Sequence, residues 1–275
     1  MAKEITLPLE VIEPVDPKLQ YVLLFGESGI GKSTITGQLQ GALHLGTDKN
    51  GMKWIAARKL DVTSFSDLNQ ILEKAIALRK SEKEKAKADP THVRQDFGFV
   101  VLDTLTYFIP MCIDEAENIF SRTMQGKNWF QNVTDPSKPS LKSEYGDITG
   151  LPNGHGWAWV WKAVENALDI LEKIAWGVVV VAHTRTNRED DLVDAKNIDL
   201  PGKIIDIVCR RMEAVAHLSR TKDNKVVATF SVGQRISAKS KAPGLDGSVV
   251  VLSEKIGDKV VAHWDRVFTY LKKAE

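Results

Sequence analysis

Nine consecutive residues near the start of this 275-residue chain have the types and the spacing of a phosphate-binding loop. Glycines let the backbone curl so that successive N–H groups point toward phosphate oxygens, and the helix that follows adds its positive end. The pattern G-x-x-x-x-G-K-[ST] is complete and lies between an apolar run and a helical stretch. It predicts an ATP-binding segment made of Gly26, Glu27, Ser28, Gly29, Ile30, Gly31, Lys32, Ser33 and Thr34.

Three side chains of this loop have predicted roles. Lys32 would contact the β- and γ-phosphates, the Ser33 hydroxyl would bind Mg²⁺, and Thr34 would contact the α-phosphate. The alternative is an ordinary glycine turn before a helix. We favour the phosphate loop, because its surroundings are those that the chemistry requires.

A site for magnesium and nucleotide needs a second anchor, usually an acidic residue at the end of a neighbouring strand. Asp103 meets this requirement, since it follows the apolar run 99–102. The alternative is that Asp103 caps the next helix. The apolar run favours the metal role, so Ser33 and Asp103 are the predicted magnesium ligands.

Hydrolysis also needs a group that orients and deprotonates water. Asp48 follows a predicted strand and could point toward the γ-phosphate, while Glu27 within the loop is its competitor. Asp48 could also be only a turn residue before Gly51. The identity of the general base therefore stays open between the two carboxylates.

His183 ends the most apolar run of the chain, residues 177–182, and so should emerge at the same edge of the sheet as the phosphates. Its ring could contact the γ-phosphate or the attacking water and report it to the next loop. A structural histidine is the alternative. The predicted catalytic set is Lys32, Asp48, Asp103 and His183.

Short apolar runs alternate with helical patterns from residue 20 to residue 183. Strands are predicted at 21–25, 42–46, 97–102 and 177–182, and helices at 32–40, from 66, from 104 to about 120 and at 157–175. This alternation predicts an α/β fold with a mostly parallel sheet flanked by helices. Strands at 214–218, 226–230 and 249–252 indicate antiparallel ribbons toward the C-terminus.

Two long polar segments, 121–155 and 184–201, interrupt this pattern and are predicted to be loops. We divide the chain into an N-terminal arm at 1–20, an ATPase core domain at 21–255 and a C-terminal extension at 256–275.

Composition adds little about partners. The net charge is +1, and Cys112 and Cys209 are too few and too far apart for a disulfide framework or a zinc site. No apolar run approaches the length of a membrane span, and the first residues lack the pattern of a signal peptide. A cytoplasmic protein without a membrane segment is expected.

The order of the motifs resembles a known family of phage proteins. In chain order the motifs are 26–34, Thr47-Asp48, 100–103, the Gly-x-Gly-Trp sequence at 154–157, and 180–183. They resemble the RecA-core ATPases of bacteriophages, the phage nucleotide-binding proteins of the Sak group that are associated with single-strand annealing and recombination. The resemblance covers about residues 18–255.

This resemblance implies a RecA-like P-loop core that uses ATP and Mg²⁺ and binds single-stranded DNA. We expect a homo-oligomer and, as a possible partner, a phage annealing protein or a single-strand-binding protein. It gives Asp103 the second-anchor role and His183 the switch role. The chain departs from the family where RecA-like enzymes usually carry a glutamate, since Asp48 is shorter by one methylene. The arm at 1–20 has no recognisable assembly motif of the RecA type.

Two segments are candidates for DNA, because a single-strand binder needs cations and stacking rings. The first segment offers Arg122 and Lys127 beside Trp129 and Phe130, although the two rings could instead pin the loop to the domain. The second, after His183, offers Arg185 and Arg188 among acidic residues.

Three cations follow the predicted strand 226–230, where ring and filament ATPases supply a charge to a neighbour's phosphate. They are Arg235, Lys239 and Lys241, and a solvated basic loop is the alternative. Two rival functions remain. One is a nucleotide-gated loader or interaction protein with little turnover, and the other is a P-loop kinase for a small molecule.

Overall fold

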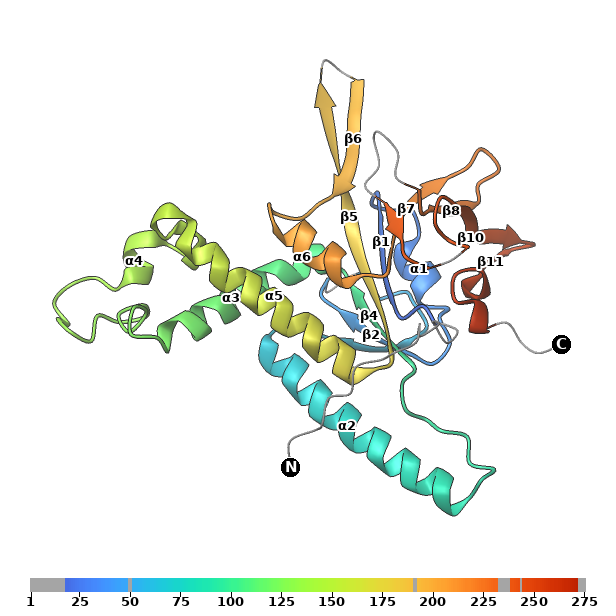
Figure 1. The fold of residues 1–275 in the computed structure, drawn as a ribbon, viewed down its shortest axis with the longest axis horizontal. Coiled ribbons are helices and arrows are strands. Elements are labelled where there is room, and N and C mark those ends of the chain that lie inside the picture. Colours follow the sequence, from blue (N-terminus) through green and yellow to red (C-terminus); the bar gives the residue numbers. More distant parts are fainter. Residues whose placement is uncertain (1–17, 49–50, 190–191, 232–237, 243, 272–275) are drawn as a thin grey trace, which may run out of the picture.

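We describe the fold from a computed structural model of the full chain, which places residues 18–48, 51–189, 192–231, 238–242 and 244–271. Its centre is a twisted sheet with helices on both faces (Figure 1). Among the described residues the sheet contains β1 (Tyr21–Gly26), β2 (Ala42–Gly46), β3 (Arg58–Asp61), β4 (Phe99–Asp103), β5 (Gly177–Glu189), β6 (Leu192–Ile198), β7 (Ala214–Arg220), β8 (Val226–Thr229), β9 (Lys239–Ser240), β10 (Val249–Ile256) and β11 (Lys259–Ala262).

The order of strands across the sheet is β11-β10-β8-β7-β1-β5-β4-β2-β3. The pairs from β7 through β1, β5, β4 and β2 to β3 are parallel, whereas β7, β8, β10 and β11 pair in an antiparallel way. The predicted fold class is therefore confirmed. One strand, β5, separates β1 from β4, so the carboxyl ends of these three strands lie next to one another.

In the part of the chain that the structure describes, six α-helices accompany these strands: α1 (Lys32–Thr36), α2 (Phe65–Ala88), α3 (Leu105–Ser121), α4 (Leu141–Tyr145), α5 (His155–Ile174) and α6 (Ile204–Arg211). The apolar faces of α2, α3, α5 and α6 pack on one side of the sheet, where Leu23, Val100 and Val180 point. On the other side, α1 and the C-terminal segment pack against Val22, Val101 and Val179. Alternation along buried strands therefore divides the core into two layers.

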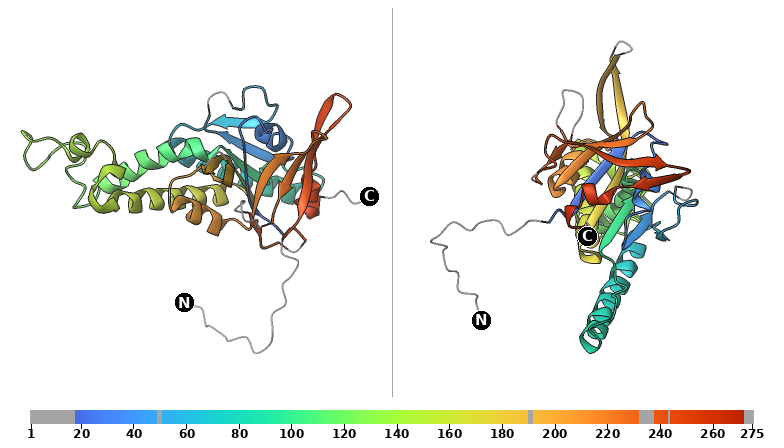
Figure 2. Two further views of the ribbon diagram at one scale, coloured as in Figure 1. Left: turned by 90° about the horizontal axis from the view of Figure 1, so that it is seen from above. Right: turned by 90° about the vertical axis from the view of Figure 1, so that its right-hand side faces the viewer.

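The prediction of a polar loop at 184–201 is wrong for most of its length. Its residues extend β5 and form an antiparallel hairpin with β6, which stands away from the body of the molecule (Figures 1 and 2). The two strands are joined by backbone pairing from Thr184 to Glu189, and such pairing needs no apolar alternation in the sequence. The predicted helix 32–40 also ends early, at Thr36, and β3, α6, β9 and β11 were not predicted.

The predicted loop 121–155 contains α4 and two short 3-10 turns, Ile148–Gly150 and Pro152–Gly154. It forms the far end of a lobe that α3 and α5 extend to one side (Figures 1 and 2). Trp129 and Ile148 are buried within this lobe. These two residues anchor the segment to the lobe, while most of its other residues are exposed or half-buried.

The described residues that follow β10 belong to the same sheet and core. β11 pairs with β10, and Trp264, Val267 and Phe268 are buried against the layer that contains α1. Within the described residues, no helix combines the length and the apolar character needed to cross a membrane.

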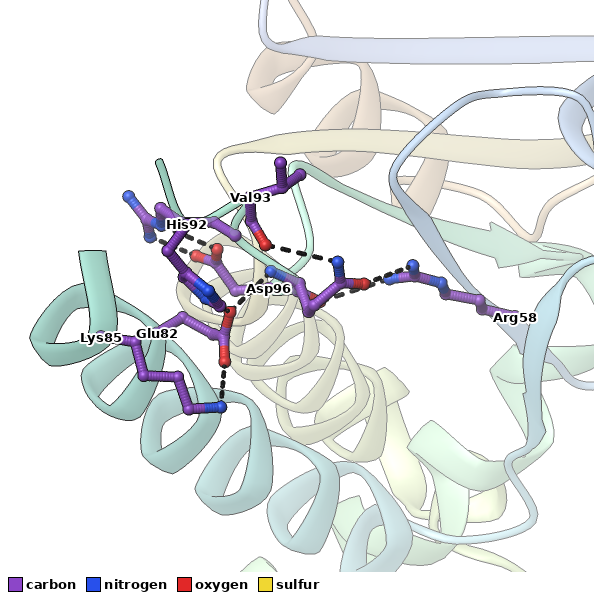
Figure 3. Close-up of polar contacts among 8 residues, drawn as sticks. Arg58, Glu82, Lys85, His92, Val93 and Asp96 are labelled. Carbon is purple, nitrogen blue, oxygen red and sulfur yellow. Dashed lines mark hydrogen bonds and ion pairs between the residues drawn. The ribbon is translucent and has the colours of Figure 1, made fainter. Parts of the chain in front are cut away.

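A buried carboxylate fixes the segment that leads into β4. Glu82, on the part of α2 that extends beyond the sheet, is 1% exposed. Its carboxylate accepts from the Lys85 ammonium at 2.8 Å and from the Gln95 backbone N–H at 2.8 Å, and it lies 2.8 Å from His92 Nε2 (Figure 3). The contacts with Lys85, His92 and Gln95, in that order, lower the pKa of Glu82 to about 2.

Replacing this carboxylate should change the acid sensitivity of the fold. Because the folded-state pKa of Glu82 is below its ordinary value of 4.5, the carboxylate stabilises the fold above pH 4.5, and this contribution is lost as the pH falls toward 2. Urea unfolding between pH 7 and pH 3 should show a smaller acid loss of stability for Glu82→Gln than for the wild type. Glu84→Gln, which removes an exposed carboxylate of the same helix, should follow the wild type. Equal slopes for Glu82→Gln and the wild type would contradict this account.

Candidate nucleotide site

The predicted phosphate loop lies at the carboxyl end of β1, near the middle of the sheet. β1 is held on both sides, by β5 and β7, and its residues 22–26 are buried. Gly29 and Gly31 have positive φ angles of 78° and 103°, a backbone conformation that favours glycine. Gly31 immediately precedes α1, so the chain turns tightly from a buried strand into a helix.

Lys32 is almost completely buried, and its ammonium is held by the loop itself. Nζ donates to the backbone carbonyls of Gly26 and Glu27, each at 2.8 Å. Burial lowers the pKa of Lys32 to about 8, against the opposing influence of Asp103 and Glu27. An ammonium with a lowered pKa and two carbonyl partners is poised to exchange these partners for anionic oxygens.

Asp103 and Ser33 converge beside this ammonium. The Asp103 carboxylate is buried, and it is hydrogen-bonded to the Ser33 side chain. Burial raises the pKa of Asp103, while Ser33, Lys32 and His183 oppose that rise. Asp103 Oδ2 is buried and has no hydrogen-bond partner. A buried carboxylate oxygen without a partner lowers the stability of the fold unless a cation or a hydrogen-bond donor binds it.

These two side chains fit a magnesium ion. Mg²⁺ prefers oxygen ligands and is usually held by one or two carboxylates together with phosphates and water. Ser33 and Asp103 present a hydroxyl and a carboxylate at one place. Among the residues that the structure describes, no group of three or more His, Cys, Asp or Glu side chains could hold a metal by itself.

Asp48 lies on the same side of the site as Asp103. β2 and β4 are neighbours, with Gly46 paired to Asp103, and the Thr47 N–H donates to the Asp103 carbonyl at 2.9 Å. The negative charge of Asp48 contributes to the raised pKa of Asp103 and opposes the lowered pKa of His183. Glu27 instead acts on Lys32, from an exposed position in the loop.

His183 faces the phosphate loop. Its place in β5 is beside Gly26 of β1, and its Nδ1 atom lies 3.4 Å from Lys32 Nζ. Burial and then the charge of Lys32 lower the pKa of His183, so the ring is neutral near pH 7 and its Nδ1 can accept from the ammonium. Tyr107 meets the imidazole edge-on, with ring centroids 5.7 Å apart.

Several residues that support the site were missed in the sequence. The Thr47 hydroxyl accepts from the Thr104 N–H at 2.9 Å and donates to the Thr104 carbonyl at 2.7 Å. The Thr106 hydroxyl accepts from the His183 N–H at 3.2 Å and donates to the carbonyl of Asp199, at the base of the hairpin, at 3.4 Å. Thr47 carried the available signal, a hydroxyl residue directly after a strand end, whereas Thr106 lies within α3 and carried none.

Arg220, at the end of β7, was also missed. Its Nη2 atom donates to the carbonyl of Ile30, within the phosphate loop, at 3.1 Å, and Nη1 donates to Asn224 Oδ1 at 2.8 Å. Nothing in the local sequence distinguishes this arginine, because its neighbour in the loop is 190 residues away.

The first predicted DNA segment is only partly available to a ligand. Trp129 is 0% exposed and packs edge-on against Phe120, so no face of its indole can stack on a base. This removes Trp129 from the predicted pair of stacking rings. Phe130 is 54% exposed and carries Lys142 over its ring, at 5.6 Å. Arg122 and Lys127 are exposed on the same lobe.

The second DNA segment lies closer to the phosphate loop. Arg185 is exposed in β5, two residues beyond His183, and Arg188 follows in the same strand, although the structure does not describe its side chain.

Of the three predicted trans cations, Arg235 lies outside the described residues. Lys239 is in β9, without a described side chain, and Lys241 is exposed. β9 pairs with Ala214 and Val215, at the start of β7 and away from the phosphate loop of its own chain.

The order of the sheet, the loop after β1 and the helix that follows it define an α/β core with the geometry of a phosphate-binding loop. Residues 18–136, less than half of the chain, match the profile of a family described as an AAA domain. A comparison with curated proteins gave no match.

Solved structures similar to this chain include the RadB recombinase, with 12% identity and a TM-score of 0.40 over 88% of this chain and 90% of that chain. They also include a KaiC-like protein from the hyperthermophilic archaeon Pyrococcus horikoshii, with 10% identity and a TM-score of 0.39 over 90% of each chain.

The lowered pKa of Lys32 predicts that the loop takes up protons when it binds a triphosphate. If a triphosphate replaces the two carbonyls, its charge should raise the pKa of Lys32 above about 8, so binding near pH 8 should take up about half a proton. Calorimetric titration with Mg·ATP in two buffers of different ionisation enthalpy measures this number. The uptake should vanish toward pH 6, where the free ammonium is already charged.

Lys32→Arg is the matched control, because a guanidinium keeps its charge at every pH used. Equal proton uptake by the wild type and Lys32→Arg near pH 8 would show that Lys32 does not titrate on binding.

Proposed function

We propose that this chain is a magnesium-dependent ATPase that acts on single-stranded DNA during phage recombination, annealing or replication, as the resemblance to the Sak group implies. The observation that carries the proposal is the convergence of Lys32, Ser33 and Asp103 at the carboxyl edge of the sheet. A basic group, a hydroxyl and a buried carboxylate with one unpartnered oxygen are the groups that a metal-bound triphosphate requires.

The loop residues would bind the triphosphate through their backbone N–H groups, with Thr34 near the α-phosphate. Lys32 would leave the carbonyls of Gly26 and Glu27 and stabilise the charge that develops on the transferring phosphoryl group. Bound Mg²⁺, held by Ser33 and Asp103, would neutralise charge on the phosphate oxygens.

Asp48 is the proposed general base. It follows β2, and its charge acts on both Asp103 and His183, at the edge of the sheet where the γ-phosphate is expected. Glu27 acts on Lys32 from the exposed side of the loop, which makes it the weaker candidate. A neutral His183 could accept a hydrogen bond from the attacking water or donate one to the γ-phosphate.

The contacts of His183 support a connection to DNA. Its ring lies against Lys32, while its backbone is tied to Thr106 and Asp199 at the base of the β5–β6 hairpin. A change of partner at Lys32 would thus be transmitted to the hairpin, where Arg185 could contact a phosphate of the strand. We place the protein in the host cytoplasm as a homo-oligomer, with Arg235, Lys239 and Lys241 as candidates for a charge supplied to a neighbouring subunit.

The direct test of the proposal is ATP turnover. The wild type should release phosphate from Mg·ATP, and Lys32→Ala should reduce turnover by at least about a hundredfold, because the charge facing the transferring phosphoryl group is lost. Asp48→Asn should keep nucleotide affinity within a small factor and slow hydrolysis by about 10²- to 10⁴-fold, the usual contribution of a general base.

Glu27→Gln is the matched control for Asp48→Asn, since it removes the competing carboxylate. Loss of turnover in Glu27→Gln alone would assign the base to the loop. Tight Mg·ATP binding by the wild type without phosphate release would favour the nucleotide-gated loader, and a phosphorylated acceptor would favour the kinase.

The hairpin gives a second test. Arg185→Ala should weaken binding of a fluorescent oligo-dT and lower the slope of log K against log salt by about 0.7, the value for one phosphate contact with a single strand. Arg122→Ala, on the lobe, should leave both quantities unchanged. The opposite outcome would move the DNA site from the hairpin to the lobe.

A further inference from the structure

The phosphate-loop helix is unusually dependent on a distant part of the chain. α1 has only five residues, and no side chain caps its N-terminus. So short a helix has too few internal hydrogen bonds to be stable alone. Two hydrogen bonds instead connect it and the turn that follows it to the C-terminal segment, which lies more than 200 residues away: the Ile35 carbonyl accepts from Trp264, and the Gln38 side chain donates to the Val260 carbonyl.

Trp264 makes the first of these contacts. Its indole Nε1–H donates to the carbonyl of Ile35, in the last turn of α1, at 2.9 Å, and both residues are buried. The indole is stacked on Phe268, with ring centroids 5.6 Å apart and planes inclined by 17°. The direction of the N–H is therefore fixed by packing.

Gln38 makes the second contact, with the edge strand β11. Its Nε2 atom donates to the Val260 carbonyl at 3.0 Å, and its Oε1 atom accepts from the Ala262 N–H at 2.9 Å. A carbonyl and an N–H two residues apart are the groups that a neighbouring strand would pair. The same Nε2 atom lies 3.4 Å from the Thr34 carbonyl, within the first turn of α1.

The C-terminal segment is itself held rigidly. β11 pairs with β10 from Ser253 to Ile256, and Glu254 of β10 is bound by Lys225 at 2.7 Å and lies 3.0 Å from His263 Nε2. His263 stands between β11 and Trp264. The residues that contact Ile35 and Gln38 are therefore held in place by the rest of the C-terminal segment.

We infer that Gln38 and Trp264 are positioning residues for the phosphate site: they fix α1 against the C-terminal ribbon and so set the orientation of Lys32 and Ser33. The inference rests on the proposed nucleotide site and adds residues 259–264 to its supporting structure. Since coupling of two sites is reciprocal, a nucleotide held by Lys32 and Ser33 must in turn steady β11.

The test begins with Gln38, because its side chain is exposed and can be shortened without loss of the fold. Gln38→Ala should weaken the affinity for a fluorescent Mg·ATP analogue about five- to tenfold, the effect of losing one or two ordinary hydrogen bonds. Gln40→Ala, which removes an exposed glutamine two residues further along, should leave it unchanged. Trp264→Phe keeps a ring against Phe268 but has no donor for Ile35, and it should weaken affinity in the same direction.

Hydrogen exchange at the Ala262 amide separates positioning from simple stabilisation. In the wild type, Mg·ATP analogue should slow exchange of this amide about fivefold or more, and in Gln38→Ala the nucleotide should have no such effect. Two results would contradict this inference and leave the proposed function standing, provided that the wild type binds Mg·ATP. One is an unchanged affinity in Gln38→Ala, and the other is exchange at the wild-type Ala262 amide that does not depend on nucleotide. Failure of the wild type to bind Mg·ATP would overturn both the inference and the proposed function.

Discussion

A buried ammonium and a buried carboxylate lie at one edge of an apolar sheet, and the rest of the site depends on which groups compensate their charges. Removing an ion from water costs several kcal/mol unless other groups replace its hydration. Lys32 has two carbonyls and the imidazole of His183, whereas Asp103 has the Ser33 hydroxyl and keeps one buried oxygen without a partner. In the proposed function, a metal-bound triphosphate would compensate both charges together.

Much of this arrangement could be predicted from the sequence. A strand buried on both faces must be a continuous apolar run, so β1, β4 and the first part of β5 were evident, and the residues at their carboxyl ends followed from them. The convergence of Lys32, Asp103 and His183 is a consequence of three parallel neighbours in register. The pairing of Gly26 with His183 and the hydrogen bond between Ser33 and Asp103 needed the structure.

Other features had no local signal. The β5–β6 hairpin is held by backbone hydrogen bonds away from the core, so its polar residues do not show the alternation by which half-buried strands are recognised. Trp129 and Phe130 are adjacent aromatic residues, and the sequence does not distinguish them. The structure shows that Trp129 is buried against Phe120 and that Phe130 is exposed. Arg220, Gln38 and Trp264 act on residues about 190 to 230 positions away, and such contacts leave no pattern in a single sequence.

The central claim is tested most directly by a crystal structure of the chain with Mg²⁺ and a non-hydrolysable ATP analogue. We predict that Lys32 Nζ exchanges the carbonyls of Gly26 and Glu27 for phosphate oxygens, and that the metal lies between the Ser33 hydroxyl and the Asp103 carboxylate. A triphosphate bound elsewhere, or a bound triphosphate with Lys32 still on its two carbonyls and Asp103 directed away from the metal, would contradict the account.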